Sequence, residues 1–307
     1  MTFGLLCSGQ GLQSALMFAL TADERPAASV FDEAAEILGC DPRRLAAESD
    51  ASKLYDNLTG QILCVVQALA ARACLEEALP ERVVIAGYSV GEMAAWSIAG
   101  AWTSREALSL VRTRAHLMDQ ASNPGDCLCA VRGLDRVLID DLCERHGCEI
   151  AIINPDRLFI IGGASPGIDR LCIDALAAGA THSSRLTVNV ASHTSRMERA
   201  IAPFQLAIDS ARPGRLTRGR TLLSGADGTP IVHPAADSRK LARQLGSRLD
   251  WAACLEAMAE AHVDRILELG PGQALAKMSR DLSLFEEVRA LDDFRSMEGV
   301  RNWIVRA

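Results

Sequence analysis

Apolar positions along this chain fall into short continuous runs and longer stripes. The short runs, each followed by glycine or serine, predict buried parallel strands at 3–7, 82–87, 222–224 and 266–269. Longer apolar stretches predict helices at 61–78 and 249–262, and another ending near residue 210. A capping box at Thr103–Glu106 opens an amphipathic helix that runs to about Ala121. Strands interleaved with helices predict an α/β fold with a parallel sheet.

The middle of the chain has an order of its own. Its pattern predicts strands at 127–132, 149–154, 157–161 and 183–188, with helices at 134–146 and 165–178. This βαββαβ order is that of a ferredoxin-like subdomain. We therefore predict a ferredoxin-like insert at 126–188, within a larger α/β core made of 1–125 and 189–307.

Composition narrows the possible partners and locations. The chain has 307 residues, 49% of them hydrophobic, and a net charge of -7. This length suits one large domain, or a domain with an insert. The acidic balance argues against nucleic acid as a partner. We find no apolar stretch of transmembrane length and no basic region leading into a signal sequence, so we expect a soluble cytoplasmic protein.

The ten cysteines do not have metal-binding spacing. No Cys-x-x-Cys pair occurs, and many of the cysteines lie inside apolar runs. Cys127 and Cys129 are two residues apart, which places them on one face of a predicted strand. We expect small buried thiols in a reducing compartment, with neither a metal nor a bound cofactor.

The segment Gly87–Glu92, with the sequence GYSVGE, carries the clearest chemistry. It lies between a predicted buried strand and a helix, so Ser89 stands at the apex of a sharp turn, as in a nucleophile elbow and a hydrolase-like core. Gly87 and Gly91 flank the serine because a Cβ there would clash in so tight a turn. A purely structural turn serine is the alternative. Glu92 fits a first-turn acid favoured by the helix dipole.

A serine nucleophile needs a base, and the chain has six histidines. His193 differs from the others because it follows the last strand of the insert, where the chain returns to the core. A structural or solvated loop histidine is the alternative reading.

Arg114 lies on the apolar face of its predicted helix, three residues after Val111 and four before Met118. A buried guanidinium is costly unless it is paired. Its partner is either a carboxylate of the protein or the carboxylate of a ligand, which the planar fork of arginine can grip with two hydrogen bonds.

Together these features resemble the malonyl-CoA:acyl-carrier-protein transacylase family, from Phe3 to about Lys277. The segments that match come in the family's order: Ser8–Gly11, the elbow at Ser89, Arg114, the insert, Ser192–His193, Gln244 before Trp251, and Gly270–Gly272.

The resemblance implies a mechanism. Ser89 would attack a malonyl thioester, and His193 would take its proton and later return it. The main-chain carbonyl of Gln244 would orient His193 in place of the usual carboxylate.

The resemblance also implies a binding site around the nucleophile. The backbone N–H groups of Gln10 and Val90 would form the oxyanion hole. Arg114 would hold the free malonyl carboxylate, and Asn154 would line the cleft. Malonyl-CoA would be the substrate, and a thiol on an acyl carrier protein the acceptor.

Two positions depart from the commonest family pattern. Tyr88 stands where the fatty-acid enzymes usually have histidine, in a position that lines the cleft, and Ser8 stands where they usually have proline. Both departures resemble the epsilon subunit of malonate decarboxylase. The carrier would then be the delta-type subunit of that system, with a phosphoribosyl-dephospho-CoA prosthetic group.

Three alternatives stay open at this point. The first is the transacylase of fatty-acid or polyketide synthesis, which has the same chemistry and a different carrier. The second is a serine thioesterase or esterase, and the third is a carrier-docking module without catalysis. A cluster of four arginines, Arg212, Arg215, Arg218 and Arg220, suggests a docking surface for the carrier or the CoA phosphates, or simply a solvated loop.

Overall fold

The computed structural model describes residues 2–306, so the outermost residues of the predicted core, 1 and 307, lie outside it. A five-stranded sheet with the order β10-β9-β1-β2-β7 forms the centre, and all of its neighbouring strands are parallel. Its strands are β1 (Thr2–Cys7), β2 (Val83–Gly87), β7 (Arg220–Leu222), β9 (Val263–Glu268) and β10 (Glu287–Ala290). The mixed α/β class with a parallel sheet is therefore confirmed.

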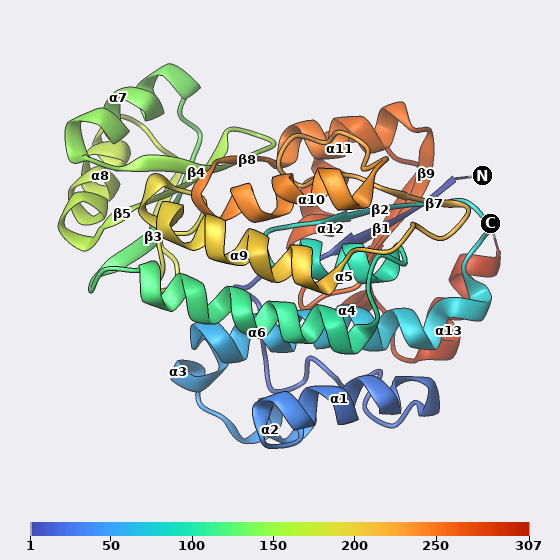
Figure 1. Ribbon diagram of the computed structural model, residues 1–307. Helices are drawn as coiled ribbons and strands as arrows, with labels where there is room; N and C mark the ends of the chain where they lie inside the picture. The colour runs from blue at the N-terminus through green and yellow to red at the C-terminus, as the bar shows by residue number, and fades with distance from the viewer. Residues whose placement is uncertain (1, 307) are drawn as a thin grey trace.

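Helices cover both faces of this sheet, as a parallel sheet requires. Figure 1 shows α4 and α6 on one side and α10 and α11 on the other. The helices of the core are α1 (Ala28–Leu38), α2 (Pro42–Glu48), α3 (Ala51–Leu54), α4 (Asn57–Leu75), α5 (Gly91–Ile98), α6 (Ser104–Ala121), α9 (Glu198–Ala211), α10 (Pro234–Arg243), α11 (Trp251–Glu260), α12 (Ala274–Leu282) and α13 (Met297–Val305). Both halves of the capping box predicted for α6 are present.

Helix α4 is apolar on nearly every side. The stretch Asn57–Ala78 is long and apolar enough to cross a membrane, and 83% of its most apolar window is buried inside the protein. The expectation that no apolar stretch reaches this length is therefore wrong. Burial on all sides is what a core helix of a large domain shows.

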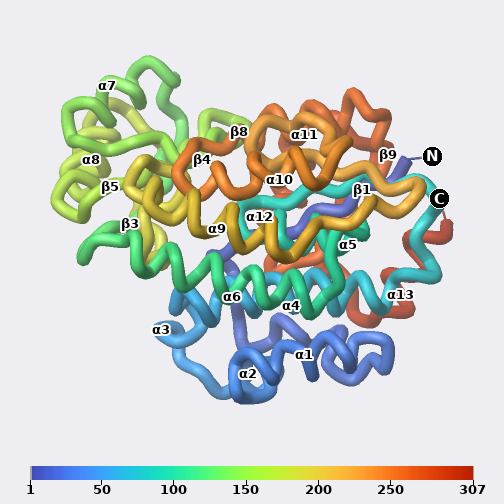
Figure 2. The backbone as a smooth tube through the Cα atoms, in the orientation of Figure 1, coloured from blue at the N-terminus to red at the C-terminus, as the bar shows by residue number. Residues whose placement is uncertain are grey.

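A second sheet, with the order β6-β3-β5-β4-β8, lies beside the first (Figures 1 and 2). Its strands and the two helices packed on it are β3 (Asp126–Arg132), α7 (Arg136–His146), β4 (Glu149–Asn154), β5 (Leu158–Ala164), α8 (Ser165–Ala177), β6 (His182–Arg185) and β8 (Leu249–Asp250). Strand β8 comes from beyond the predicted insert and pairs in parallel with β4. The two parts of the chain thus share this sheet.

The two faces of the second sheet have different neighbours, because side chains alternate along a strand. Cys127 and Cys129 of β3 point into a small separate core with α7 and α8, on one face as expected. Leu128 and Ala130 of the same strand pack against the main core. The face of the second sheet that carries Leu128 and Ala130, called its inner face below, therefore packs toward the carboxyl ends of the central strands.

Candidate active site

Ser89 stands on a turn that only glycine neighbours allow. It lies two residues after the end of β2, and its φ of 54° lies in the left-handed region. A Cβ on Gly91 would lie 2.1 Å from the carbonyl oxygen of Cys7, and one on Gly87 would lie 2.3 Å from the Cα of Glu92. Both positions therefore need glycine. The turn presents the serine at the carboxyl edge of the sheet, where α5 begins.

His193 contacts the predicted nucleophile. Its Nε2 lies 2.8 Å from the Ser89 hydroxyl, and its Nδ1 lies 2.6 Å from the main-chain carbonyl oxygen of Gln244. A carbonyl can only accept, so Nδ1 carries the hydrogen and Nε2 is free to accept from the serine. This is the arrangement of a nucleophile and its general base.

The protonation state of His193 suits a base. Burial, with a smaller contribution from the charge of Arg114, lowers the pKa of His193 to about 3. The imidazole is therefore neutral at physiological pH and ready to take a proton.

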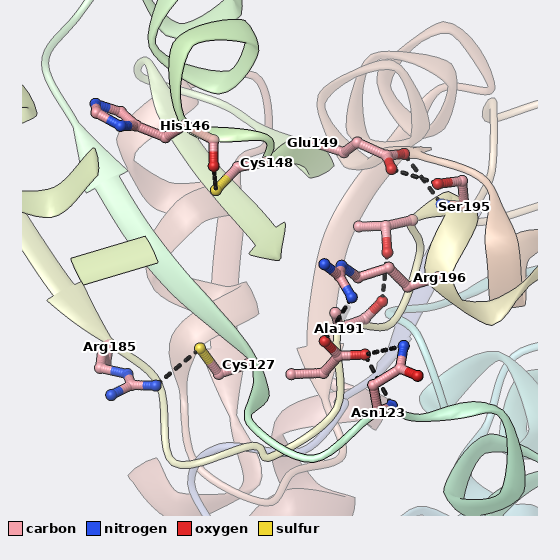
Figure 3. Close-up of polar contacts among 11 residues, drawn as sticks. Asn123, Cys127, His146, Cys148, Glu149, Arg185, Ala191, Ser195 and Arg196 are labelled. Atoms are coloured by element: carbon pink, nitrogen blue, oxygen red, sulfur yellow. Dashed lines mark hydrogen bonds and ion pairs between the residues drawn. The ribbon is translucent and has the colours of Figure 1, made fainter. Parts of the chain in front are cut away.

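Several contacts hold the turn that carries His193. The backbone of His193 has a φ of 62°, and its N–H donates to the carbonyl of Leu245 at 2.8 Å. Ser195 and Arg196, two and three residues further on, are tied to the second sheet (Figure 3). The N–H of Ser195 donates to Glu149 at 3.0 Å, and the guanidinium of Arg196 donates to Asp126 at 2.7 Å. The turn is thus fixed both by the segment around Leu245 and by the second sheet.

Gln10 and Val90 lie on the two segments that flank Ser89. A Cβ on Gly9 would lie 2.8 Å from the carbonyl oxygen of Tyr88, so this glycine lets the loop after β1 pack against the elbow. Within residues 2–306, the backbone N–H groups of Gln10 and Val90 donate to no other backbone carbonyl. Two N–H groups of this kind can receive a developing oxyanion.

Arg114 is buried, with 1% of its surface exposed. Its Nη1 donates to Oε1 of Gln61 at 2.5 Å, and its Nη2 has no partner. Among residues 2–306 no carboxylate forms a direct ion pair with Arg114, although the charge of the buried Glu92 acts on it from a greater distance. Burial lowers the pKa of Arg114 to about 10, so the group is still cationic at neutral pH. A buried cation with an unused donor can bind an anionic ligand group.

A cleft of about 290 Å³ lies over the nucleophile. Gln10, Tyr88, Ser89, Asn154 and His193 line it, together with apolar side chains from the inner face of the second sheet. Both polar side-chain atoms of Asn154 are buried without a partner. The structure thus brings together the predicted cleft residues, whereas Arg114 and Gln244 are not among the residues that line the cleft.

The sequence analysis missed two buried carboxylates beside this cleft. Glu268, at the end of β9, lines the cleft and accepts a 2.7 Å hydrogen bond from the hydroxyl of Ser8. It also accepts from the N–H groups of Leu275 and Ala276 at the start of α12. Burial raises the pKa of Glu268 to about 7. A signal was available, since a strand that ends in glutamate just before Gly-Pro-Gly places a carboxylate at the edge that holds the site.

The second carboxylate is Glu92, which is fully buried behind the elbow. It accepts hydrogen bonds from Gly225, Gln244 and Trp96. Burial raises the pKa of Glu92 to about 7. Glu92 lies in the first turn of α5, as expected, but its burial and its partners from distant parts of the sequence were not anticipated.

The arginine cluster lies away from the cleft. Arg220 pairs with Val83 at the start of β2, whereas Ser89 follows the end of that strand. Its side chain donates to the carbonyl of Pro80 and faces Glu76. This placement at the amino edge of the sheet counts against direct contact between Arg220 and a substrate in the cleft.

Comparison with known proteins agrees with this geometry. The acyl transferase domain family matches residues 5–229, which is most of the chain. The chain belongs to the acyl transferase domain family. It is therefore an acyltransferase, and the enzyme class expected from the sequence is confirmed.

Relatives of this acyltransferase match it along nearly their whole length. It is 27% identical to the malonyl CoA-acyl carrier protein transacylase of Haemophilus influenzae, over 99% of both chains. A crystal structure of the acyl-carrier-protein S-malonyltransferase of Burkholderia pseudomallei is 27% identical, with a TM-score of 0.90 over 98% of this chain and 100% of that one.

A third similar structure is a complex. It contains a malonyl-transacylase with its type II polyketide acyl-carrier protein, and it matches at 25% identity and a TM-score of 0.90 over 98% of this chain and 99% of that one. The resemblance to malonyl-CoA:acyl-carrier-protein transacylases is thus confirmed. These relatives support the transacylase alternative and lend no support to a closer likeness to the malonate decarboxylase epsilon subunit.

Proposed function

We propose that this acyltransferase moves a malonyl group from malonyl-CoA to the thiol of an acyl carrier protein, through an acyl-enzyme at Ser89. The observation that carries the proposal is the arrangement of Ser89, His193 and the Gln244 carbonyl, with the unpaired guanidinium of Arg114 close enough to lower the pKa of His193.

Each half of the reaction exchanges one bond for another. The Ser89 oxygen attacks the thioester carbonyl as its proton passes to Nε2 of His193. The carbon–sulfur bond then breaks, and His193 returns the proton to the leaving CoA thiolate. In the second half His193 takes the proton of the carrier thiol, and sulfur attacks the ester carbonyl. The ester carbon–oxygen bond then breaks, and His193 returns the proton to the Ser89 oxygen.

Two groups would stabilise the charges that this chemistry involves. The backbone N–H groups of Gln10 and Val90 would bind the oxyanion of the tetrahedral intermediate. The free carboxylate of the malonyl group would pair with Arg114 and use its unpartnered Nη2. Such a pair would favour malonyl over acetyl, because acetyl leaves the buried cation unpaired.

As the carrier, we propose first that of fatty-acid or polyketide synthesis. The similar transacylases, one of them in complex with its carrier protein, support this choice. The malonate decarboxylase carrier is the second candidate, because Tyr88 and Ser8 depart from the common pattern. Both residues line the cleft, and Ser8 is engaged with Glu268.

The domain assignment belongs to the same proposal. We take 126–188 as a ferredoxin-like subdomain and 1–125 with 189–307 as a hydrolase-like core. The order β6-β3-β5-β4 and the elbow between β2 and α5 support these names. The free thiols support a reducing compartment such as the cytoplasm.

A transfer assay with two carriers tests the proposal. Purified enzyme receives labelled malonyl-CoA and a carrier bearing either phosphopantetheine or the phosphoribosyl-dephospho-CoA group. Faster transfer to the first would support a transacylase of fatty-acid or polyketide synthesis, and faster transfer to the second would support malonate decarboxylation. Release of free malonate at the same rate with and without a carrier would overturn both and indicate a thioesterase.

A further inference from the structure

Glu92 is a buried carboxylate that the mechanism does not use. Its Oε1 accepts from the indole N–H of Trp96 at 3.3 Å. Its Oε2 accepts from the N–H of Gly225 at 3.0 Å and from the side-chain amide of Gln244 at 2.8 Å. A fully buried carboxylate is expensive unless such donors surround it. A buried carboxylate in this position, behind the nucleophile, therefore indicates a specific role for Glu92.

Gln244 joins this carboxylate to the base. Its main-chain carbonyl accepts from Nδ1 of His193 at 2.6 Å, while its side chain donates to Glu92. The residue lies where α10 gives way to the short 3-10 helix Gln244–Gly246, so no long element fixes its carbonyl. The side-chain bond to Glu92 is therefore a direct restraint on the carbonyl that orients the imidazole.

We infer that Glu92 is a positioning residue, which fixes the Gln244 carbonyl and through it the imidazole of His193. Ser89, His193, Gln244 and Glu92 form one continuous chain of hydrogen bonds with lengths of 2.8, 2.6 and 2.8 Å. Glu92 thus supports His193 indirectly, through Gln244. The group that contacts His193 is a neutral carbonyl, where a usual catalytic triad has a carboxylate. The inference deepens the proposed function, because it concerns the same nucleophile and base.

The competing explanation is that Glu92 only ties α5 to the loop after β7 through Gly225. Three variants separate the two explanations. Gln244→Met keeps the main-chain carbonyl and removes only the side-chain link. Glu92→Leu removes the acceptor, whereas Glu92→Gln keeps one amide oxygen that can accept from Gln244. The matched control is Trp96→Phe, which removes a donor to Glu92 that does not lead to His193.

The experiment measures how fast phenylmethylsulfonyl fluoride labels Ser89. In that reaction the serine oxygen bonds to sulfur, the sulfur–fluorine bond breaks, fluoride leaves, and His193 takes the proton. The rate therefore reports activation of the nucleophile without any malonyl substrate. Single-turnover acylation by malonyl-CoA is measured beside it, and thermal melting shows that each variant is folded.

We expect Gln244→Met and Glu92→Leu each to slow labelling about tenfold, because small displacements of catalytic groups cost this much or more. The double variant should be no slower than either single one, and Glu92→Gln should recover most of the rate. The KM for malonyl-CoA should stay unchanged while kcat falls. Trp96→Phe should keep its labelling rate within about twofold of the wild type, since every link from Ser89 to Glu92 is intact.

A wild-type labelling rate in Gln244→Met would overturn the inference, even if Glu92→Leu fails to fold. Additive losses in the double variant would also overturn it, because they would mean that the two side chains act separately. If malonyl-CoA fails to acylate the enzyme while labelling follows the predicted order, the proposed function falls and the positioning role of Glu92 stands.

Discussion

Nδ1 of His193 lies 2.6 Å from the main-chain carbonyl oxygen of Gln244, and no carboxylate of residues 2–306 forms a hydrogen bond or ion pair with the imidazole. A carbonyl dipole fixes the tautomer of the ring but offers the protonated ring less stabilisation than a carboxylate does. Burial and the charge of Arg114 act in the same direction and lower the pKa of His193 to about 3. The site is therefore built around a base that gives its proton back readily.

The low pKa of His193 predicts the pH dependence of acylation. A base works in its unprotonated form, so activity is lost only as pH falls through the pKa of that base. Because His193 stays unprotonated over this range, we expect its protonation to cause no fall in the single-turnover rate with malonyl-CoA between pH 8 and pH 5. Stopped-flow release of CoA measures this rate. A fall centred near pH 6.5, as for an ordinary histidine, that persists in Glu92→Gln and Glu268→Gln would contradict the account, because those two carboxyl groups have pKa values of about 7 themselves.

Replacement of His193 should remove general base catalysis while leaving the nucleophile in place. We expect His193→Ala to slow acylation roughly 10²–10⁴-fold with little change in the binding of malonyl-CoA. His116→Ala serves as the control, because His116 is exposed on the outer face of α6 and lines a separate surface hollow. Equal activity in both variants would mean that another group acts as the base.

Arg114→Ala tests the selection of the malonyl carboxylate. A hydrogen-bonded ion pair to a substrate carboxylate contributes about 1.5–3 kcal/mol, so malonyl transfer should fall about 10–100-fold. Acetyl transfer should change little. Arg112 is exposed on the same helix, and Arg112→Ala should leave both rates unchanged. Equal losses for malonyl and acetyl in Arg114→Ala would make that residue structural.

Glu268 should make the stability of the protein depend on pH. Its pKa is raised to about 7 in the folded state, above the ordinary value near 4.5, so the folded protein binds its proton more tightly than the unfolded chain does. Its contribution is therefore fully present below about pH 4.5 and is lost as pH rises through 7. We expect Glu268→Gln to reduce the fall in unfolding free energy between pH 5 and pH 8 by on the order of 2 kcal/mol. Urea unfolding at both pH values measures the change, and an unchanged difference would contradict it.

Much of the site could be predicted from local sequence. Gly87 and Gly91 mark the elbow, because the turn brings backbone so close that no side chain fits. The inward face of Arg114 follows from helical spacing. The proximity of His193 followed from its position after the insert.

Other features depend on contacts that no local pattern carries. Strand β8 has only two residues, and the run 249–262 was expected to be helical throughout. Pairing with β4 makes its first two residues a strand. Glu92 is a first-turn acid of α5, as predicted, but its burial could not be predicted because Gly225 and Gln244, its partners, lie 133 and 152 residues away in the sequence.

The segment before α4 was not assigned from the sequence. Helices α1, α2 and α3 lie there, and the apolar positions Val30, Phe31, Ala34, Ile37 and Leu38 of α1 do follow a helical period that was available in the sequence. The apolar side of α1 is completed by packing against α4 and α6. Such helices take much of their stability from tertiary contacts rather than from their own sequence.

Mass spectrometry of the peptide that contains Ser89, after the enzyme is mixed with malonyl-CoA, tests the central claim most directly. The account predicts a malonyl ester on Ser89 that disappears when a carrier protein with a free thiol is added, and no adduct in Ser89→Ala. An adduct that persists in Ser89→Ala, or one on Ser89 that no carrier thiol discharges, would contradict it.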